Sequence, residues 1–241
     1  MWPQQNPKFK FKKFDVSHGQ SSMKVGTDAV LLGTWVEVEG CSKALDVGTG
    51  TGVISLILAQ RFPQLIIDAI DIHSESIEEA QFNFEASPWN NRLSAEHISL
   101  QNKDVTATHF DLVISNPPFF EAGNLSPIEE RSKARHTKTL DYNTLITTSS
   151  KLLTDGGLFA VVLPFSVEGK FSEKCNANGL RLWRRLAFQP KGDKPPERIL
   201  LQFRKSNTVP LEADEVLIHY NSDGTWTDGY KNLTRDFYLK I

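Results

Sequence analysis

The chain has 241 residues, of which 39% are hydrophobic and 23% charged, and its formal net charge is −2. These values are typical of a globular protein with a sizeable core, and the small negative charge excludes a protein that coats polyanions through its bulk charge. No apolar run is long enough to span a bilayer, and the basic start lacks the apolar stretch of a secretory signal, so we expect a cytoplasmic protein.

The first 22 residues form a basic arm in which lysines alternate with phenylalanines, and this alternation predicts a short edge strand or an ordered extension. From residue 23 the pattern becomes regular and indicates a single domain, 23–241. Thr27 or Asp28 is expected to cap the first helix, and Ser74 a later one. The predicted strands cover 43–47, 65–71, 110–116 and 157–163, and the predicted helices cover 27–35, 53–61, a segment from 74, 141–153 and 166–178.

Strands that alternate with helices at this spacing predict right-handed crossovers and a parallel sheet with helices on both faces. The fold class is therefore α/β, a doubly wound, Rossmann-like sheet that is mostly parallel. The runs 180–190 and 198–205 flank a Gly/Pro-rich turn and predict a carboxyl-terminal antiparallel pair, and 215–220 and 236–241 are candidates for short further strands.

The two cysteines, Cys41 and Cys175, are far apart in the sequence and belong to no Cys/His cluster. We therefore expect two core thiols, with no disulfide framework and no metal site.

Three alternate glycines lie between the first core strand and the helix that follows it. Gly48, Gly50 and Gly52 let the backbone turn tightly and let a ligand approach, and Asp46 precedes them. A dinucleotide site would show a GxGxxG spacing, whereas the spacing here is GxGxG, and an acid at Asp46 would repel a pyrophosphate. The pattern favours S-adenosylmethionine, which carries ammonium and sulfonium charges. Asp71, at the end of the next strand, is placed to accept hydrogen bonds from two ribose hydroxyls.

These residues resemble the glycine motif and the strand-end acid of class I S-adenosylmethionine-dependent methyltransferases. The resemblance implies that Asp104, in the segment QNKDVT, matches the acid near the adenine ring of the cofactor, although an exposed loop aspartate would look the same.

The run NPPF, Asn116 to Phe119, follows a predicted strand next to the glycine-loop strand, where α/β sheets bind ligands. A conjugated exocyclic amine is a poor nucleophile because its lone pair is delocalised, and two acceptors that take its two N–H groups free that lone pair. Asn116 supplies a side-chain carbonyl and Pro117 a backbone carbonyl fixed by the Pro-Pro step. Phe119 can stack on the planar substrate. The motif resembles that of methyltransferases acting on adenine N6, guanine N2 or protein glutamine.

A narrower resemblance links most of the chain to the bacterial tRNA adenine-N6 methyltransferases that modify the adenine 3′ of the anticodon in a valine tRNA. It runs through Phe9 to Trp35, the glycine motif, NPPFF, the ARH tripeptide at 134–136 and the strand GGLFAVVLP. The resemblance implies that the segment from Met23 to Asp28 covers the methionine end of the cofactor, with Lys24, Gly26 and Thr27 as contacts.

Basic clusters near the predicted cleft suit an RNA substrate whose target base is flipped into the pocket. One cluster lies in the amino-terminal arm and another in the long loop after NPPF, where His136 is expected to contact phosphate and not to act as a base. Guanine-N2 methylation of rRNA, glutamine-N5 methylation of a protein, and a non-catalytic RNA-binding role stay open as alternatives. No membrane, metal or obligate protein partner is indicated. The candidate RNA contacts are Lys10, Lys12, Lys13, Arg131, Lys133, Arg135 and His136.

Overall fold

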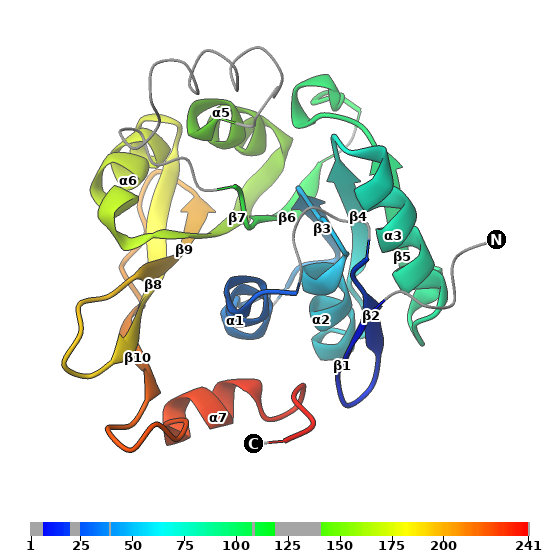
Figure 1. The fold of residues 1–241 in the computed structure, drawn as a ribbon. Coiled ribbons are helices and arrows are strands. Elements are labelled where there is room, and N and C mark those ends of the chain that lie inside the picture. Colours follow the sequence, from blue (N-terminus) through cyan, green and yellow to red (C-terminus); the bar gives the residue numbers. More distant parts are fainter. Residues whose placement is uncertain (1–6, 20–24, 39, 108, 119–140, 241) are drawn as a thin grey trace, which may run out of the picture.

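The computed structural model describes residues 7–19, 25–38, 40–107, 109–118 and 141–240, and its ribbon is drawn in Figure 1. The strands are β1 (Lys8–Lys10), β2 (Asp15–Ser17), β3 (Lys43–Val47), β4 (Ile66–Asp71), β5 (Leu93–His97), β6 (Phe110–Ser115), β7 (Leu153–Pro164), β8 (Leu180–Lys191), β9 (Arg198–Lys205) and β10 (Ala213–Tyr220). The α-helices are α1 (Thr27–Trp35), α2 (Val53–Arg61), α3 (Ser74–Glu85), α5 (Tyr142–Leu152), α6 (Glu168–Ala177) and α7 (Asp228–Thr234), and short 3₁₀ turns lie at Asn90–Arg92, Leu100–Asn102 and Phe165–Val167.

Eight strands form one sheet in the order β10-β8-β9-β7-β6-β3-β4-β5. The run from β7 through β6, β3 and β4 to β5 is parallel, whereas β9 is antiparallel to both β7 and β8, so the predicted mostly parallel sheet and its antiparallel pair are confirmed. The candidate strand 215–220 lies within β10, which pairs with β8 in parallel.

Helices cover both faces of this sheet (Figure 1). One core cluster joins apolar side chains of α1, α2, α3 and α7 to one face, and the other joins α5 and α6 to the opposite face. Because β3, β4 and β6 are parallel neighbours, their carboxyl ends meet at one edge, which is where the glycine loop, Asp71 and the NPP turn follow in the chain.

The described part of the predicted arm is a two-stranded antiparallel hairpin, β1 and β2. Phe11, Phe14 and Val16 are buried in the main core cluster, and the Lys12 amide donates to the Phe237 carbonyl at 2.8 Å. The hairpin therefore packs on the domain and against the carboxyl-terminal residues. The predicted boundary between arm and domain at residue 22 stays a prediction.

Several local predictions were wrong. Gly26 and His73, and not Thr27, Asp28 or Ser74, occupy the N-cap positions of α1 and α3, and neither helix has a side-chain cap. The Asp28 carboxylate instead accepts a hydrogen bond from Arg198 at 2.9 Å. Residues 236–240 form no strand beyond an isolated bridge between Phe11 and Tyr238.

Both cysteines are free thiols, but only Cys175 lies fully in the core, since Cys41 is half-buried. Among the helices within the described ranges, none is long and apolar enough to cross a membrane.

Candidate active site at the carboxyl edge of the sheet

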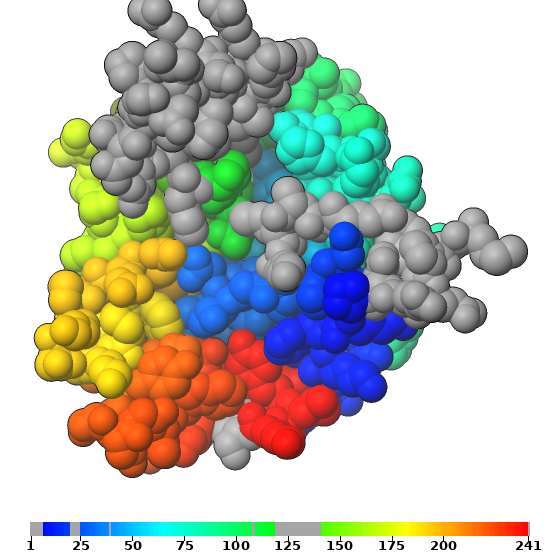
Figure 2. All heavy atoms as spheres, in the orientation of Figure 1, coloured from blue at the N-terminus to red at the C-terminus, as the bar shows by residue number. Residues whose placement is uncertain are grey.

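A pocket of about 320 Å³ opens where the ends of β3 and β6 meet the amino-terminal ends of α1 and α2. In Figure 2, α1, the green end of β6 and the darkest blue amino-terminal hairpin appear on the same face of the molecule. The pocket brings together three segments that are far apart in the sequence. Its lining consists of Gly26, Thr27, Asp28, Ala29, Gly48, Thr49, Gly50, Thr51, Val53, Ile54, Asn116, Pro117 and Pro118.

The three predicted glycines have left-handed backbones, with φ of 70° at Gly48, 55° at Gly50 and 80° at Gly52. A Cβ added to Gly48 would meet no atom within 4 Å, so this glycine keeps the floor of the pocket open to a ligand. A Cβ at Gly52 would lie 2.5 Å from the Phe84 ring. Gly52 does not line the pocket, and its lack of a side chain lets α2 approach α3.

Asp46 is fully buried beneath the loop. One carboxylate oxygen, Oδ2, accepts from the Thr49 and Ser55 hydroxyls at 2.8 and 2.7 Å, whereas Oδ1 has no hydrogen-bond partner among the described residues. Burial raises the pKa of the Asp46 carboxyl from 3.8 to about 6, against the lowering effect of the two hydroxyls, and the charge of Asp71 raises it further. A cationic ligand at this end of β3 would stabilise the carboxylate.

Asp71 lies at the end of β4 and is 8% exposed. Its Oδ2 accepts from the Gly50 amide at 3.0 Å and its Oδ1 accepts from the His73 amide, also at 3.0 Å. These bonds fix the carboxylate against the glycine loop and leave each oxygen one further lone pair for a hydroxyl donor.

Asn116 follows the last residue of β6, where the Ser115 hydroxyl donates to the Val47 carbonyl at 2.8 Å and ties β6 to β3. The Asn116 Oδ1 atom is buried and has no partner within the part of the chain that the structure describes. Pro117 is buried and Pro118 exposed, and both line the pocket with Asn116. The pocket thus holds a side-chain acceptor that no described residue uses.

Gly26 and Thr27, the cofactor contacts that the resemblance implied, line the pocket at the start of α1, beside the first free amides of that helix. Their contact with a cofactor stays a prediction. Asp104 does not line the pocket: its carboxylate is exposed and accepts from the Thr106 amide and hydroxyl at 2.8 and 2.7 Å, which lowers its pKa. Its contact with a cofactor stays a prediction.

Lys10, Lys12 and Lys13 are exposed on the hairpin, and the Lys12 ammonium donates to the Arg235 carbonyl. The remaining predicted contacts lie outside the described residues: Lys24, Phe119, Arg131, Lys133, Arg135 and His136. No group of three side chains suited to a metal ion occurs within the ranges given above.

The sequence-based prediction missed buried polar residues that support the pocket. Besides Thr49 and Ser55, these are Glu79 and Asn83 on α3, which are 0% and 2% exposed. A helix residue that bonds to a distant backbone leaves no local signal, except that a carboxylate and an amide occupy an otherwise apolar helix face.

This fold and this edge-of-sheet pocket define a class I methyltransferase. Residues 18–170 match the family model of the methyltransferase small domain. A predicted O-methyltransferase from Agrobacterium tumefaciens has the same fold, with a TM-score of 0.69 and 18% sequence identity over 87% of this chain and 96% of that one.

Curated sequences define the family more narrowly. Proteins named tRNA1(Val) (adenine(37)-N6)-methyltransferase are 39% identical in Proteus mirabilis, over 96% of this chain and 93% of the relative, and 41% identical in Trichodesmium erythraeum, over 96% and 98%. The relative of that name in Dyadobacter fermentans is 38% identical over 98% and 99%. The chain belongs to this family of tRNA1(Val) adenine-N6 methyltransferases.

Proposed function

We propose that this protein transfers the methyl group of S-adenosylmethionine to N6 of an adenine in the anticodon loop of tRNA, at the base 3′ of the anticodon in a valine tRNA. The observation that carries the proposal is the buried Oδ1 of Asn116, which lacks a hydrogen-bond partner among the described residues and lies in a pocket shared with the glycine loop. The names of the relatives support the same substrate.

The pocket and two carboxylates that adjoin its glycine loop without lining it fit the cofactor. Asp46 is buried beneath the loop and suits the ammonium group, since one of its oxygens has no partner among the described residues. Asp71, which accepts from the Gly50 amide, suits the ribose hydroxyls. The start of α1, with Gly26 and Thr27, offers backbone amides and the positive end of a nine-residue helix to its carboxylate. When bound, S-adenosylmethionine supplies an electrophilic methyl group.

Asn116 and Pro117 would hold the target amine. Two carbonyl oxygens that accept its two N–H groups turn the nitrogen lone pair out of the ring and aim it along the line of displacement. No strong base is required, because the amine loses a proton readily once it is methylated. Phe119 would stack on the base.

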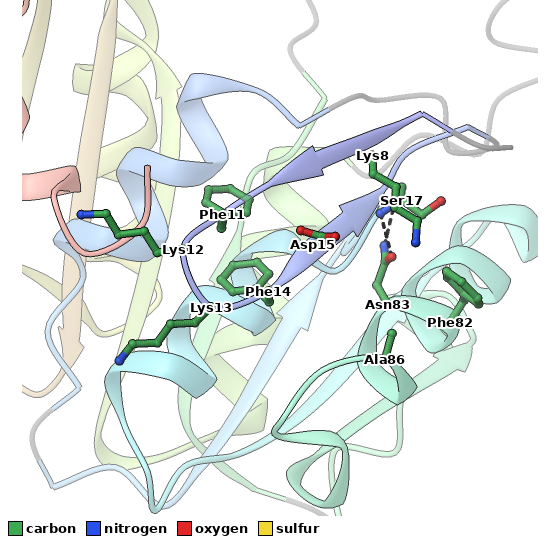
Figure 3. A pocket seen from close by; sticks show the side chains of 10 residues that line it. All are labelled: Lys8, Phe11, Lys12, Lys13, Phe14, Asp15, Ser17, Phe82, Asn83 and Ala86. Atoms are coloured by element: carbon green, nitrogen blue, oxygen red, sulfur yellow. Dashed lines mark hydrogen bonds between the residues drawn. The ribbon is translucent and has the colours of Figure 1, made fainter. Parts of the chain in front are cut away.

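The exposed lysines of the hairpin would contact the tRNA backbone. Lys8, Lys12 and Lys13 line a groove of about 430 Å³ between the hairpin and α3 (Figure 3), and Lys10 is exposed on β1. Basic groups of this kind bind phosphates without reading bases. The segment after NPPF would add further contacts, from Arg131, Lys133, Arg135 and His136. The reaction would take place in the cytoplasm.

The test is methyl transfer from labelled S-adenosylmethionine to separate fractions of total tRNA, rRNA and protein from cells that lack the enzyme, followed by nucleoside and amino-acid analysis. We expect N6-methyladenosine in the anticodon loop of one valine tRNA. Labelled N2-methylguanosine in rRNA, or labelled glutamine in protein, would overturn the assigned substrate. Failure to bind the cofactor would leave only the non-catalytic RNA-binding role.

A further inference from the structure

Asn83 is a buried amide that ties three separate segments together. Its Oδ1 accepts from the Ser17 amide at 2.8 Å, and its Nδ2 donates to the Ser17 carbonyl at 3.0 Å and to the Thr51 carbonyl at 2.8 Å. Figure 3 shows the two bonds to Ser17, with Asn83 reaching from α3 to the end of β2. Both amide hydrogens and the amide oxygen are therefore used.

One of these bonds reaches the lining of the proposed cofactor pocket. Thr51 belongs to the glycine loop, lines the pocket and is itself 3% exposed. The Thr51 carbonyl belongs to the peptide bond between Thr51 and Gly52. Gly52 packs against Phe84, which lies on α3 together with Asn83. A buried carbonyl without a donor is costly, so the Asn83 amide fixes the direction in which this peptide points.

The other two bonds hold the amino-terminal hairpin to the same helix. Next to them, the Gly19 amide donates to Glu79 Oε1 at 2.6 Å, so α3 holds the chain at the last residue of β2 and again two residues later. Val25 begins the next described stretch, and Gly26, which follows it, lines the pocket. Asn83 thus lies between the hairpin and the glycine loop without touching the pocket itself.

We propose that Asn83 is a positioning residue that sets the affinity for S-adenosylmethionine by holding the Thr51 peptide and the hairpin in a fixed arrangement. The inference rests on the proposed function. It assigns Asn83 an effect on cofactor binding, and none on the acceptor atoms of Asn116 and Pro117.

The chain offers a matched control. Gln202 on β9 is also a fully buried amide that clamps one residue of backbone: its Oε1 accepts from the Glu37 amide at 3.2 Å and its Nε2 donates to the Glu37 carbonyl at 2.6 Å. Glu37 follows the carboxyl end of α1, whereas the pocket lies at the amino end. Asn83→Ala and Gln202→Ala therefore each remove a buried amide that bonds to the amide and carbonyl of one residue, and both should lower stability. Only Asn83→Ala also removes a bond to the glycine loop.

Calorimetric titration with S-adenosylmethionine, below the melting temperature of each variant, tests the inference. We expect Asn83→Ala to bind about tenfold more weakly, the effect of one lost hydrogen bond at the upper end of the usual range. In turnover assays its KM for the cofactor should rise while kcat stays within about twofold. Gln202→Ala should melt earlier and bind the cofactor as the wild type does.

A second variant decides the matter if Asn83→Ala does not fold. Asn83→Asp keeps the acceptor for the Ser17 amide and, when the new carboxyl is ionised, loses the donations to the Ser17 and Thr51 carbonyls. We expect its cofactor affinity, relative to the wild type at the same pH, to be low at neutral pH and to recover in part as the pH falls, because a protonated carboxyl regains one donor.

The inference is overturned if either Asn83 variant binds like the wild type, or if Gln202→Ala weakens cofactor binding equally. If the wild type does not bind S-adenosylmethionine at all, the proposed function itself fails, and that result is distinct from the others.

Discussion

Replacing Gly52 by alanine should destabilise the protein through packing, although the residue belongs to the glycine motif. A left-handed backbone costs a residue with a Cβ about 1–2 kcal/mol. The new Cβ would also lie 2.5 Å from Cε1 and 2.9 Å from Cζ of Phe84, and such overpacking costs about 1–3 kcal/mol more. We expect Gly52→Ala to lower the free energy of unfolding by about 2–5 kcal/mol, a large part of the stability of an ordinary domain.

Gly48→Ala is the matched control, because Gly48 has a similar φ of 70° and no atom within 4 Å of an added Cβ. Gly48→Ala should lower the free energy of unfolding only by the backbone cost of about 1–2 kcal/mol. It should also weaken cofactor binding, because the new methyl group occupies part of the pocket. Urea unfolding measures the loss of stability in both variants. In a double-mutant cycle, Phe84→Leu removes the clashing ring and should reduce the destabilisation caused by Gly52→Ala. Equal losses for Gly48→Ala and Gly52→Ala, with no coupling to Phe84, would refute the assignment of Gly52 to helix packing.

Three further changes test the site. Asn116→Ala should keep cofactor affinity within about twofold and lower kcat by roughly a hundredfold or more, as loss of a preorganised polar contact does. Turnover like that of the wild type would refute the assigned role of Asn116 as an acceptor for the target amine. The pKa of Asp46 is about 6 in the folded protein and 3.8 in a free side chain, so folding binds a proton and stability should fall as pH rises from about 4 to 6. Cofactor affinity should rise over the same pH window and level off above it, because the ammonium group of the cofactor favours the ionised carboxylate. Calorimetry at several pH values measures this affinity, and Asp46→Asn should remove its dependence on pH. Replacing Lys10 and Lys13 together by glutamine should raise the KM for tRNA and reduce its dependence on salt. Lys191→Gln, at the exposed last residue of β8, should change neither.

The elements that the sequence predicted best are those with strong local signals. The strand at Lys43–Val47 and the helix at Val53–Arg61 have the predicted bounds, because an apolar run ends at the glycine loop and the helix ends just before Pro63. The meeting of Asn116 with the glycine loop was predictable for the same reason, since parallel strands bring their carboxyl ends to one edge.

What could not be predicted depends on contacts between distant segments. The Asp28 side chain is recruited by Arg198, which is 170 residues away, and so it does not cap its own helix. The strand β5 carries only partly buried and exposed side chains, so it lacks the apolar run of a core strand. The role of Asn83 also depends on bonds to Ser17 and Thr51, which only the folded chain brings together.

Two buried acceptors at the ends of adjacent strands connect stability with function. Asp46 pairs with Ile114 across β3 and β6, so Asn116 follows only two residues beyond that pair. Oδ1 of Asp46 and Oδ1 of Asn116 both have no donor among the described residues, and each such atom costs a folded protein about 1–3 kcal/mol. If these two acceptors had only a structural role, we would expect a nearby hydroxyl to donate a hydrogen bond to each of them. Thr49 and Ser55 donate in this way to the other oxygen of Asp46. The donors that complete these acceptors in the proposed reaction are both amines, the ammonium of the cofactor at Asp46 and the target amine at Asn116. Ligand binding should therefore restore stability that the free protein lacks.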